Sequence, residues 1–218
     1  MPPLDDQGIR FLTFDCYGTL VEWRNGIESN FREFFGGREG EVFTKYVALE
    51  AGEENTYSSY KEILRNTSLR LAGELGFNPN PTSATKFADS ITKWRAFPDS
   101  APALKELGRK GYKRVILSNI DRDLLSETIR NNDLEVDGYI TAQDVKSYKP
   151  AKNHWLRFFE EYGANKEEVL HVANSTYHDI IPATELGLRT VWVNRYNEDL
   201  AKDANPTYIV NGVSELLK

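Results

Sequence analysis

The feature that most constrains this chain is an alternation of short apolar runs with segments of helical character. The runs that read as strands lie at 9–15, 113–119, 138–144, 168–175 and 189–195, and a further short run lies at 206–210. Helical segments separate most of them, and Ser100 is the expected N-cap of the helix before the second run. Strands that alternate with helices favour an α/β fold, with a parallel sheet covered by helices on both faces.

One segment interrupts this alternation. Residues 22–97, roughly a third of the chain, show no strand pattern, and apolar residues recur there at helical spacing. The segment follows the first strand directly, so it should stand where open α/β sheets bind ligands. We expect a core of residues 1–21 and 98–218 and an all-helical cap of residues 22–97, which closes over the core.

Composition excludes several classes of function. The formal net charge of -6 disfavours non-specific nucleic-acid binding. No apolar run approaches the ~20 residues of a membrane span, and the first ten residues lack the pattern of a signal peptide. A single cysteine, Cys16, suits a reducing compartment. We expect a cytoplasmic protein that acts on a small molecule, without nucleic-acid or membrane partners; a homodimer is left open.

Polar residues stand at the carboxyl ends of the predicted strands. Asp15 ends the first strand, Ser118 and Asn119 close the second, Lys149 lies in the loop after the third, and Asp179 follows the fourth. The carboxyl ends of parallel strands meet at one edge of a sheet, so these side chains should share one crevice. Each alone could merely cap a turn. Together they indicate a catalytic site, in which an ionised carboxylate can act as a nucleophile.

Four stretches around these residues resemble the motifs of the haloacid dehalogenase-like hydrolase superfamily: FDCYGTL, LSNIDR, SYKP and HVANSTYHD. The resemblance covers the whole predicted α/β core. It implies a Rossmann-like fold and hydrolysis through a covalent aspartyl intermediate. By position, Asp15 resembles the nucleophile, Lys149 the residue that keeps it ionised, and Asp179 the carboxylate of the fourth motif. Thr19 and Ser118 resemble groups that orient the nucleophile or bind substrate.

Tyr17 stands where phosphatases of this superfamily usually carry a second aspartate, which protonates the leaving alkoxide. Tyrosine is a much weaker acid than aspartic acid, with a reference pKa of about 10 against about 3.9. A halide leaves without a proton, so the D-x-Y-G-T form resembles the L-2-haloacid dehalogenase branch. Simple packing of Tyr17 in the turn is the alternative.

Asn174 stands where those phosphatases usually carry an aspartate that binds Mg²⁺. Its amide is neutral, and a hard dication prefers carboxylate oxygens. We therefore expect that no cofactor is required. A role for Mg²⁺ stays open, with Asp15, Tyr17 and Asp179 as its ligands. The alternative function is then a Mg²⁺-dependent phosphatase that acts on a small phosphate ester.

The segment after the first motif departs from the haloacid dehalogenases. Their W-R-x-x-Q stretch supplies an arginine for the substrate carboxylate, whereas residues 41–55 here hold Lys45 and several glutamates. The stretches TFDCYGTL, ILSNIDR and ITAQDV-x-SYKP look closer to a sister group that includes an L-azetidine-2-carboxylate hydrolase. The expected substrate is therefore a small 2-substituted carboxylic acid, either a 2-haloacid or a strained ring amino acid.

The expected substrate contacts come from both parts of the chain. They are Tyr17, Thr19, Arg24, Ser118, Asn119 and Asn174. Arg24, just past the first turn, is the candidate for the substrate carboxylate. The three histidines do not share a metal-ligand spacing, and His171, inside a strand pattern, is expected to be a core residue.

Overall fold

The computed structural model describes residues 8–35, 42–53 and 57–218, and its centre is a six-stranded parallel sheet. The strand order is β3-β2-β1-β4-β5-β6, which is the order of Rossmann folds. The strands are β1 (Phe11–Phe14), β2 (Lys113–Ser118), β3 (Gly138–Thr141), β4 (Val169–Ala173), β5 (Arg189–Val193) and β6 (Tyr208–Val210). The predicted α/β class is confirmed, and the short run at 206–210 supplies the sixth strand.

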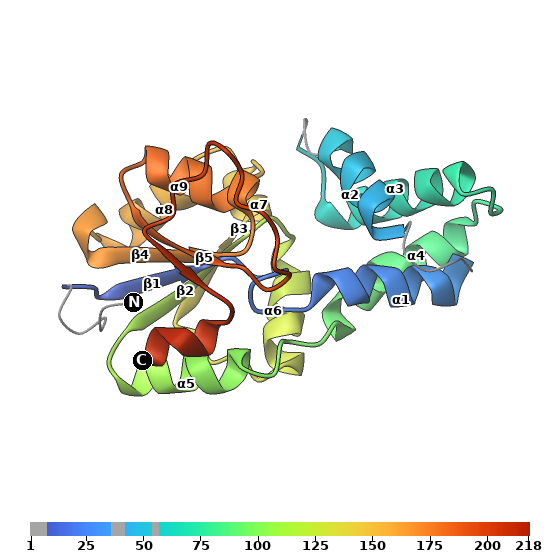
Figure 1. Ribbon diagram of the computed structural model, residues 1–218. Helices are drawn as coiled ribbons and strands as arrows, with labels where there is room; N and C mark the ends of the chain where they lie inside the picture. Colours follow the sequence, from blue (N-terminus) through green and yellow to red (C-terminus); the bar gives the residue numbers. More distant parts are fainter. Residues whose placement is uncertain (1–7, 36–41, 54–56) are drawn as a thin grey trace.

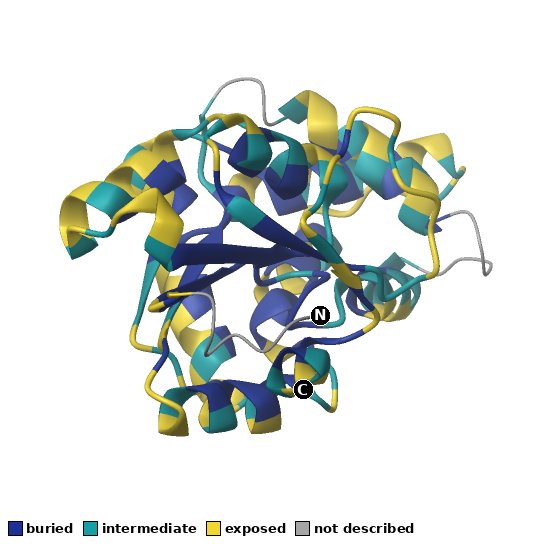
Figure 2. Cartoon of the chain, turned by 60° about the vertical axis from the view of Figure 1, so that its left-hand side comes forward, coloured by how far each residue is buried: buried dark blue, intermediate teal, exposed yellow. Residues whose placement is uncertain are grey.

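Helices cover both faces of this sheet (Figure 1). One face carries α5 (Ser100–Arg109), α6 (Arg122–Asn131) and the turn η5 (Val213–Leu217). The other carries α7 (Ala142–Val145), α8 (Asn153–Tyr162) and α9 (Ile181–Glu185), with the short turns η3 (Lys166–Glu168) and η4 (Thr176–Ile180). Every residue of β1 and β4 is therefore buried, and the strands at the centre of Figure 2 have the buried colour.

Two predicted details of the core were wrong. The third strand was expected to reach residue 144, but it ends at Thr141. Thr141 and Asp144 form a capping box, in which each side chain accepts a hydrogen bond from the other's backbone N–H, and this starts α7. Ser100 does not cap α5; its Oγ instead donates to the carbonyl oxygen of Leu20 at 2.8 Å. Ser100 thus ties α5 to the loop after β1.

The described residues of the segment 22–97 contain helices and no strand. They are α1 (Trp23–Phe35), α2 (Val42–Glu53), α3 (Tyr60–Glu74), α4 (Pro81–Ser90) and the turn η2 (Ile91–Lys93). A capping box between Ser59 and Glu62 begins α3, and Asn80 caps α4. These helices form a group beside the sheet, at the end opposite the chain termini (Figure 1). Within the described ranges, no helix is long and apolar enough to cross a membrane.

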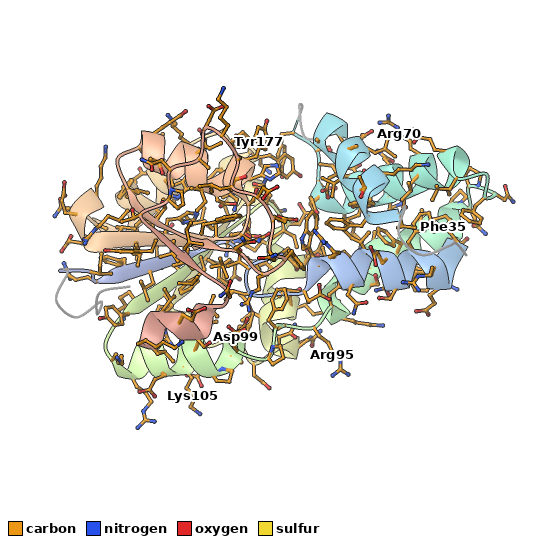
Figure 3. The ribbon with its side chains drawn as sticks, in the orientation of Figure 1. Phe35, Arg70, Arg95, Asp99, Lys105 and Tyr177 are labelled. Carbon is orange, nitrogen blue, oxygen red and sulfur yellow. The ribbon has the colours of Figure 1, made fainter. Side chains whose placement is uncertain are left out.

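The two chain crossings between this helical group and the sheet lie side by side. The N–H of Glu22 donates to the carbonyl oxygen of Arg95, and the N–H of Phe97 donates to that of Leu20, both at 2.9 Å. Figure 3 labels Arg95 and Asp99 along the second crossing. Both crossings therefore leave the sheet next to the loop that follows β1.

A second contact holds α3 against the core. The carboxylate of Asp121 accepts hydrogen bonds from the backbone N–H groups of Tyr60 and Lys61, at 3.1 and 3.0 Å. These N–H groups belong to the first turn of α3, which has no intrahelical acceptors for them and carries a partial positive charge. The hydroxyl of Tyr148 also donates to the carbonyl oxygen of Ser58 at 2.8 Å. The helical group is thereby placed above the carboxyl ends of the strands.

Candidate active site

A cavity of about 360 Å³ lies at the carboxyl edge of the sheet, between the core and the helical group. Core residues line one side, and Trp23, Arg24, Phe43, Glu50 and Tyr60 line the other. Eight of the nine predicted site residues line this cavity: Asp15, Tyr17, Arg24, Ser118, Asn119, Lys149, Asn174 and Asp179. The ninth, Thr19, is fully buried and contacts Asp15. We call this space the Asp15 cavity.

Lys149 joins the two carboxylates of the cavity. Its ammonium donates to Asp15 Oδ1 at 2.9 Å and to Asp179 Oδ1 at 2.6 Å. Its third hydrogen bond, also 2.9 Å, goes to the carbonyl oxygen of Leu117 on β2. All three groups are at most 7% exposed, so their charges must compensate one another. One cation between two carboxylates leaves the site with one net negative charge.

The three charges hold one another in place. Burial alone would raise the pKa of Asp179, but the Lys149 ammonium and the hydrogen bond from His171 outweigh it and lower the pKa to about 2. Burial would lower the pKa of Lys149, but both carboxylates raise it above its ordinary value. For Asp15, burial is the largest influence and raises the pKa, while the charge of Lys149 opposes it. Asp179 is thus the more acidic carboxyl of the pair.

The turn after β1 presents Asp15 to the cavity. Thr19 Oγ1 donates to Asp15 Oδ2 at 2.8 Å and accepts from the backbone N–H of Asn174 at 2.9 Å. Gly18 has a φ of 95°, a conformation that L side chains rarely adopt. A Cβ at this glycine would also lie 3.0 Å from Trp23 Nε1 and 3.3 Å from Asn174 Oδ1. The turn therefore requires glycine at this position, for both its φ and its space.

Two of the residues predicted to contact substrate, Tyr17 and Asn119, form hydrogen bonds to other groups of the protein. The hydroxyl of Tyr17 shares a hydrogen bond of 2.7 Å with Thr128 on α6. The side chain of Asn119 accepts from the N–H of Lys149 at 2.7 Å and donates to its carbonyl oxygen at 3.0 Å. Both polar atoms of the Asn119 amide thus fix the backbone of Lys149, and a contact of this amide with substrate oxygens stays a prediction.

The model of the haloacid dehalogenase-like hydrolase family matches residues 9–187. The chain belongs to this family. It is 23% identical over 195 residues to haloacetate dehalogenase H-2 of Moraxella sp. (strain B), covering 86% of this chain and 87% of that one. It is 26% identical over 216 residues to (S)-2-haloacid dehalogenase 4A of Burkholderia cepacia, covering 95% and 93%.

A solved structure of a family member shares the fold. It is the L-2-haloacid dehalogenase from Xanthobacter autotrophicus with chloropropionic acid covalently bound. The TM-score is 0.86 at 20% identity, over 96% of this chain and 97% of that chain. The likeness thus extends through both the sheet and the helical group.

The donor set of the cavity does not fit a tightly held dication. The two carboxylates already share the Lys149 ammonium, and Asn174 adds only a neutral amide, whose Nδ2 donates to the carbonyl oxygen of Val193 at 2.9 Å. The hydroxyl of Tyr17, the third residue of the predicted ligand set, is bound to Thr128. Among the residues that the structure describes, no three His, Cys, Asp or Glu side chains form a metal-binding group. The residues present therefore do not favour a tightly held dication.

Arg24 lies in the wall of the Asp15 cavity, between two aromatic rings. Its Cζ is 4.5 Å from the ring centre of Phe43 and 4.1 Å from that of Tyr196. Nη2 donates to Glu198 at 2.8 Å, whereas Nε is buried without a hydrogen-bond partner in the described chain. A buried N–H of a charged group without an acceptor is costly. The guanidinium is therefore held rigidly, with a donor still to be satisfied.

His171 belongs to the site, although the sequence pattern indicated a core residue. It is fully buried, and its Nε2 lies 3.1 Å from Asp179 Oδ1. Its Nδ1 lies 2.9 Å from the hydroxyl of Thr13. The available signal was a single polar residue in each of two otherwise apolar runs, FLTF and VLHVA. In parallel register these two residues are direct neighbours.

Proposed function

We propose that this family member displaces a leaving group from carbon 2 of a small carboxylic acid, with Asp15 as the nucleophile. The observation that carries the proposal is the Asp15 carboxylate, oriented by Thr19 and Lys149 in the wall of the Asp15 cavity. The names of the similar dehalogenases support a halide as the leaving group.

In the first step, an Asp15 oxygen forms a bond to carbon 2 and the bond to the leaving group breaks. A halide leaves with the electron pair and takes no proton. A strained ring ammonium would leave as the neutral amine, again without an acid. The product of this step is an ester between Asp15 and the substrate carbon.

In the second step, the oxygen of a water molecule bonds to the Asp15 carboxyl carbon, and Asp179 accepts its proton. The bond between that carbon and the substrate oxygen then breaks, and the proton passes from Asp179 to the departing hydroxyl group. Asp15 returns to the carboxylate form with release of one proton. The sum is the conversion of a 2-haloacid and water into a 2-hydroxy acid, halide and a proton.

The helical group of residues 22–97 acts as a cap in this proposal. Its side chains Trp23, Arg24, Phe43 and Tyr60 line the cavity opposite Asp15, so they determine which acid fits. The paired crossings are the hinge about which the cap can open to admit substrate and water.

The phosphatase alternative receives less support from Tyr17. Burial raises the pKa of its hydroxyl well above the ordinary value, and Thr128 holds it by a hydrogen bond. Such a group is a poor proton donor to a leaving alkoxide. A screen of 2-haloacids, azetidine-2-carboxylate and phosphate esters, each with and without Mg²⁺, tests the proposal. Turnover of phosphate esters alone would reject it.

We expect hydrolysis of a 2-haloacid to survive removal of divalent cations. The positive charge beside Asp15 comes from Lys149, and the leaving halide needs no metal-linked acid. Release of halide should be unchanged after dialysis against EDTA and unchanged by added Mg²⁺. Activity that disappears on chelation and returns with Mg²⁺ would contradict the prediction and favour the phosphatase.

Arg24→Lys should raise KM for 2-chloropropionate while kcat changes less. The proposed role of Arg24 in the cavity wall is to bind the substrate carboxylate, and such charged hydrogen bonds contribute about 1.5–3 kcal/mol, or roughly 10- to 150-fold in binding. Lysine lacks the planar group that stacks between the two rings. Steady-state kinetics of purified variants provide the measurement.

Arg122→Lys is the matched control for this substitution. Arg122 also pairs with a carboxylate, Asp144, at 2.9 Å and stacks at 5.0 Å on Tyr139, but it does not line the cavity. Its replacement should leave KM unchanged. Equal effects of the two substitutions would argue against a carboxylate-binding role for Arg24.

A further inference from the structure

A buried chain of hydrogen bonds reaches Asp179 from behind the sheet edge. Thr13 on β1 and His171 on β4 are direct neighbours in the parallel register. The hydroxyl of Thr13 lies 2.9 Å from His171 Nδ1, and His171 Nε2 lies 3.1 Å from Asp179 Oδ1. The ring of Trp155 packs edge-to-face against His171, with ring centres 5.2 Å apart. The four side chains are at most 1% exposed, so this series of hydrogen bonds is shielded from water.

The chemistry of Thr13, His171 and Asp179 determines which of them donates in the hydrogen bond to Asp179. An ionised carboxylate only accepts hydrogen bonds, so the contact to Asp179 requires a proton on His171 Nε2. The hydroxyl of Thr13 can donate to Nδ1 or accept from it, so it satisfies that nitrogen in either form of the ring. The contact with Thr13 therefore holds the ring with Nε2–H towards Asp179.

The two oxygens of Asp179 are left in different environments. Oδ1 receives the ammonium of Lys149 at 2.6 Å as well as His171. Oδ2 is buried and has no hydrogen-bond partner within the described residues, although Asp179 lines the Asp15 cavity. With Oδ1 bound by two donors, Oδ2 is the oxygen that remains for a water molecule in the cavity. The carboxylate cannot turn without losing both donors.

We propose that His171, held by Thr13, is a positioning residue that fixes the Asp179 carboxylate for the hydrolysis of the Asp15 ester. Lys149 alone would hold Oδ1 through one flexible side chain that also serves Asp15. The rigid imidazole adds a second point of attachment from the sheet itself. The effect on ester hydrolysis rests on the proposed function, whereas the effect on the Asp179 carboxylate does not.

The charges around Asp179 determine the direction of the expected pH effect. The titratable groups that face it are Lys149 and Asp15 across the cavity, His171 on β4 and His154 on α8. The charge of Lys149 and the hydrogen bond of His171 favour the ionised form of Asp179. Removal of the histidine donor should therefore raise the pKa of Asp179 and move the acid limb of kcat towards neutral pH.

His171→Phe and His171→Gln test the role directly, in the full-length protein. With 2-chloropropionate as the probe, His171→Phe should slow hydrolysis of the Asp15 ester by roughly 10- to 100-fold, which is part of the roughly 10²- to 10⁴-fold that a general base contributes. Formation of the ester, measured by rapid quench and mass spectrometry, should change less, so the ester should accumulate. His171→Gln, whose amide can donate to Asp179, should restore part of the rate.

Thr13→Val and Thr190→Val form a second, matched pair. Thr13→Val leaves the imidazole in place and should shift the acid limb of kcat in the same direction, but less. This variant keeps the test valid if His171→Phe disrupts the sheet. Thr190 is also a buried strand threonine, but its hydroxyl bonds to the backbone of Thr207. Its valine variant should keep the wild-type pH profile. Equal pH profiles for all four variants and wild type would overturn the proposal.

The pKa of Asp179, read by NMR of ¹³C-labelled carboxyl groups without substrate, separates the two proposals. A higher pKa of Asp179 in His171→Phe than in wild type would support the positioning role. If no Asp15 ester forms in either protein, the proposed reaction is rejected while the positioning role stands. An ester that His171→Phe hydrolyses at the wild-type rate, with an unchanged midpoint, would reject the positioning role and leave the reaction standing.

Discussion

Asp15→Asn should reduce turnover of 2-chloropropionate by at least about 10⁴-fold, in line with removal of a nucleophile in other enzymes. An amide oxygen is a much weaker nucleophile than a carboxylate, and the amide nitrogen would face the donors of Lys149 or Thr19. The fold should survive, because asparagine has the same shape. Circular dichroism and halide release measure the two parts of this expectation. Asp137→Asn, at the far end of the sheet and paired with Arg114, should retain activity.

Isotope labelling tests the covalent intermediate itself. In a single turnover in H₂¹⁸O with enzyme in excess, ¹⁸O should enter the Asp15 carboxylate, because water attacks the carbonyl carbon of the ester. The peptide that contains Asp15 is then analysed by mass spectrometry. Label that appears in the 2-hydroxy acid while Asp15 stays unlabelled would mean that water attacks the substrate directly.

Lys149→Met should abolish activity and lower the free energy of unfolding by about 3–5 kcal/mol at neutral pH, the usual cost of leaving a buried charge unpaired. In wild type, the Lys149 ammonium is 1% exposed and compensates both Asp15 and Asp179. Methionine fills a similar volume but leaves two buried carboxylates facing each other. Urea unfolding, followed by tryptophan fluorescence, measures the loss.

The cost of this substitution should depend on pH. In wild type the pKa of Asp179 is lowered to about 2, so its contribution to stability is present above its unfolded pKa and is lost as the pH falls towards 2. Without the ammonium, repulsion raises the pKa of at least one carboxyl, and stability is then lost as the pH rises through that value. The difference between variant and wild type should therefore be larger at pH 7.5 than at pH 4.5.

Lys152→Met provides the control for the loss of a lysine. Lys152 is also paired with a carboxylate, Glu185 at 2.9 Å, but both side chains are well exposed. Exposed pairs contribute about 0–1 kcal/mol, so this variant should remain close to wild type in stability and activity. A Lys149→Met variant that is equally destabilised at both pH values would argue against uncompensated carboxylates as the cause.

Much of the fold and the central part of the site could be predicted from sequence. The apolar runs have the length of buried strands and alternate with helical segments, and this local pattern is sufficient to indicate a parallel sheet. Because parallel strands end at one edge, the positions of Asp15, Lys149 and Asp179 after three different strands already imply that they lie near one another. The tertiary structure adds the distances, and with them the ammonium shared by both carboxylates.

Only the tertiary structure decided where the remaining polar groups point. The Tyr17 hydroxyl turns to Thr128, 111 positions away in the sequence, and no local pattern indicates that partner. Arg24 stands between rings from two parts of the chain. His171 had the pattern of a core residue because its neighbours in β4 are apolar, and it is indeed buried. Its contact with Asp179 depends on a turn of the chain after β4 that returns the carboxylate to the strand edge. Burial can be predicted from local sequence, whereas the partner of a buried polar group is determined by how distant segments pack.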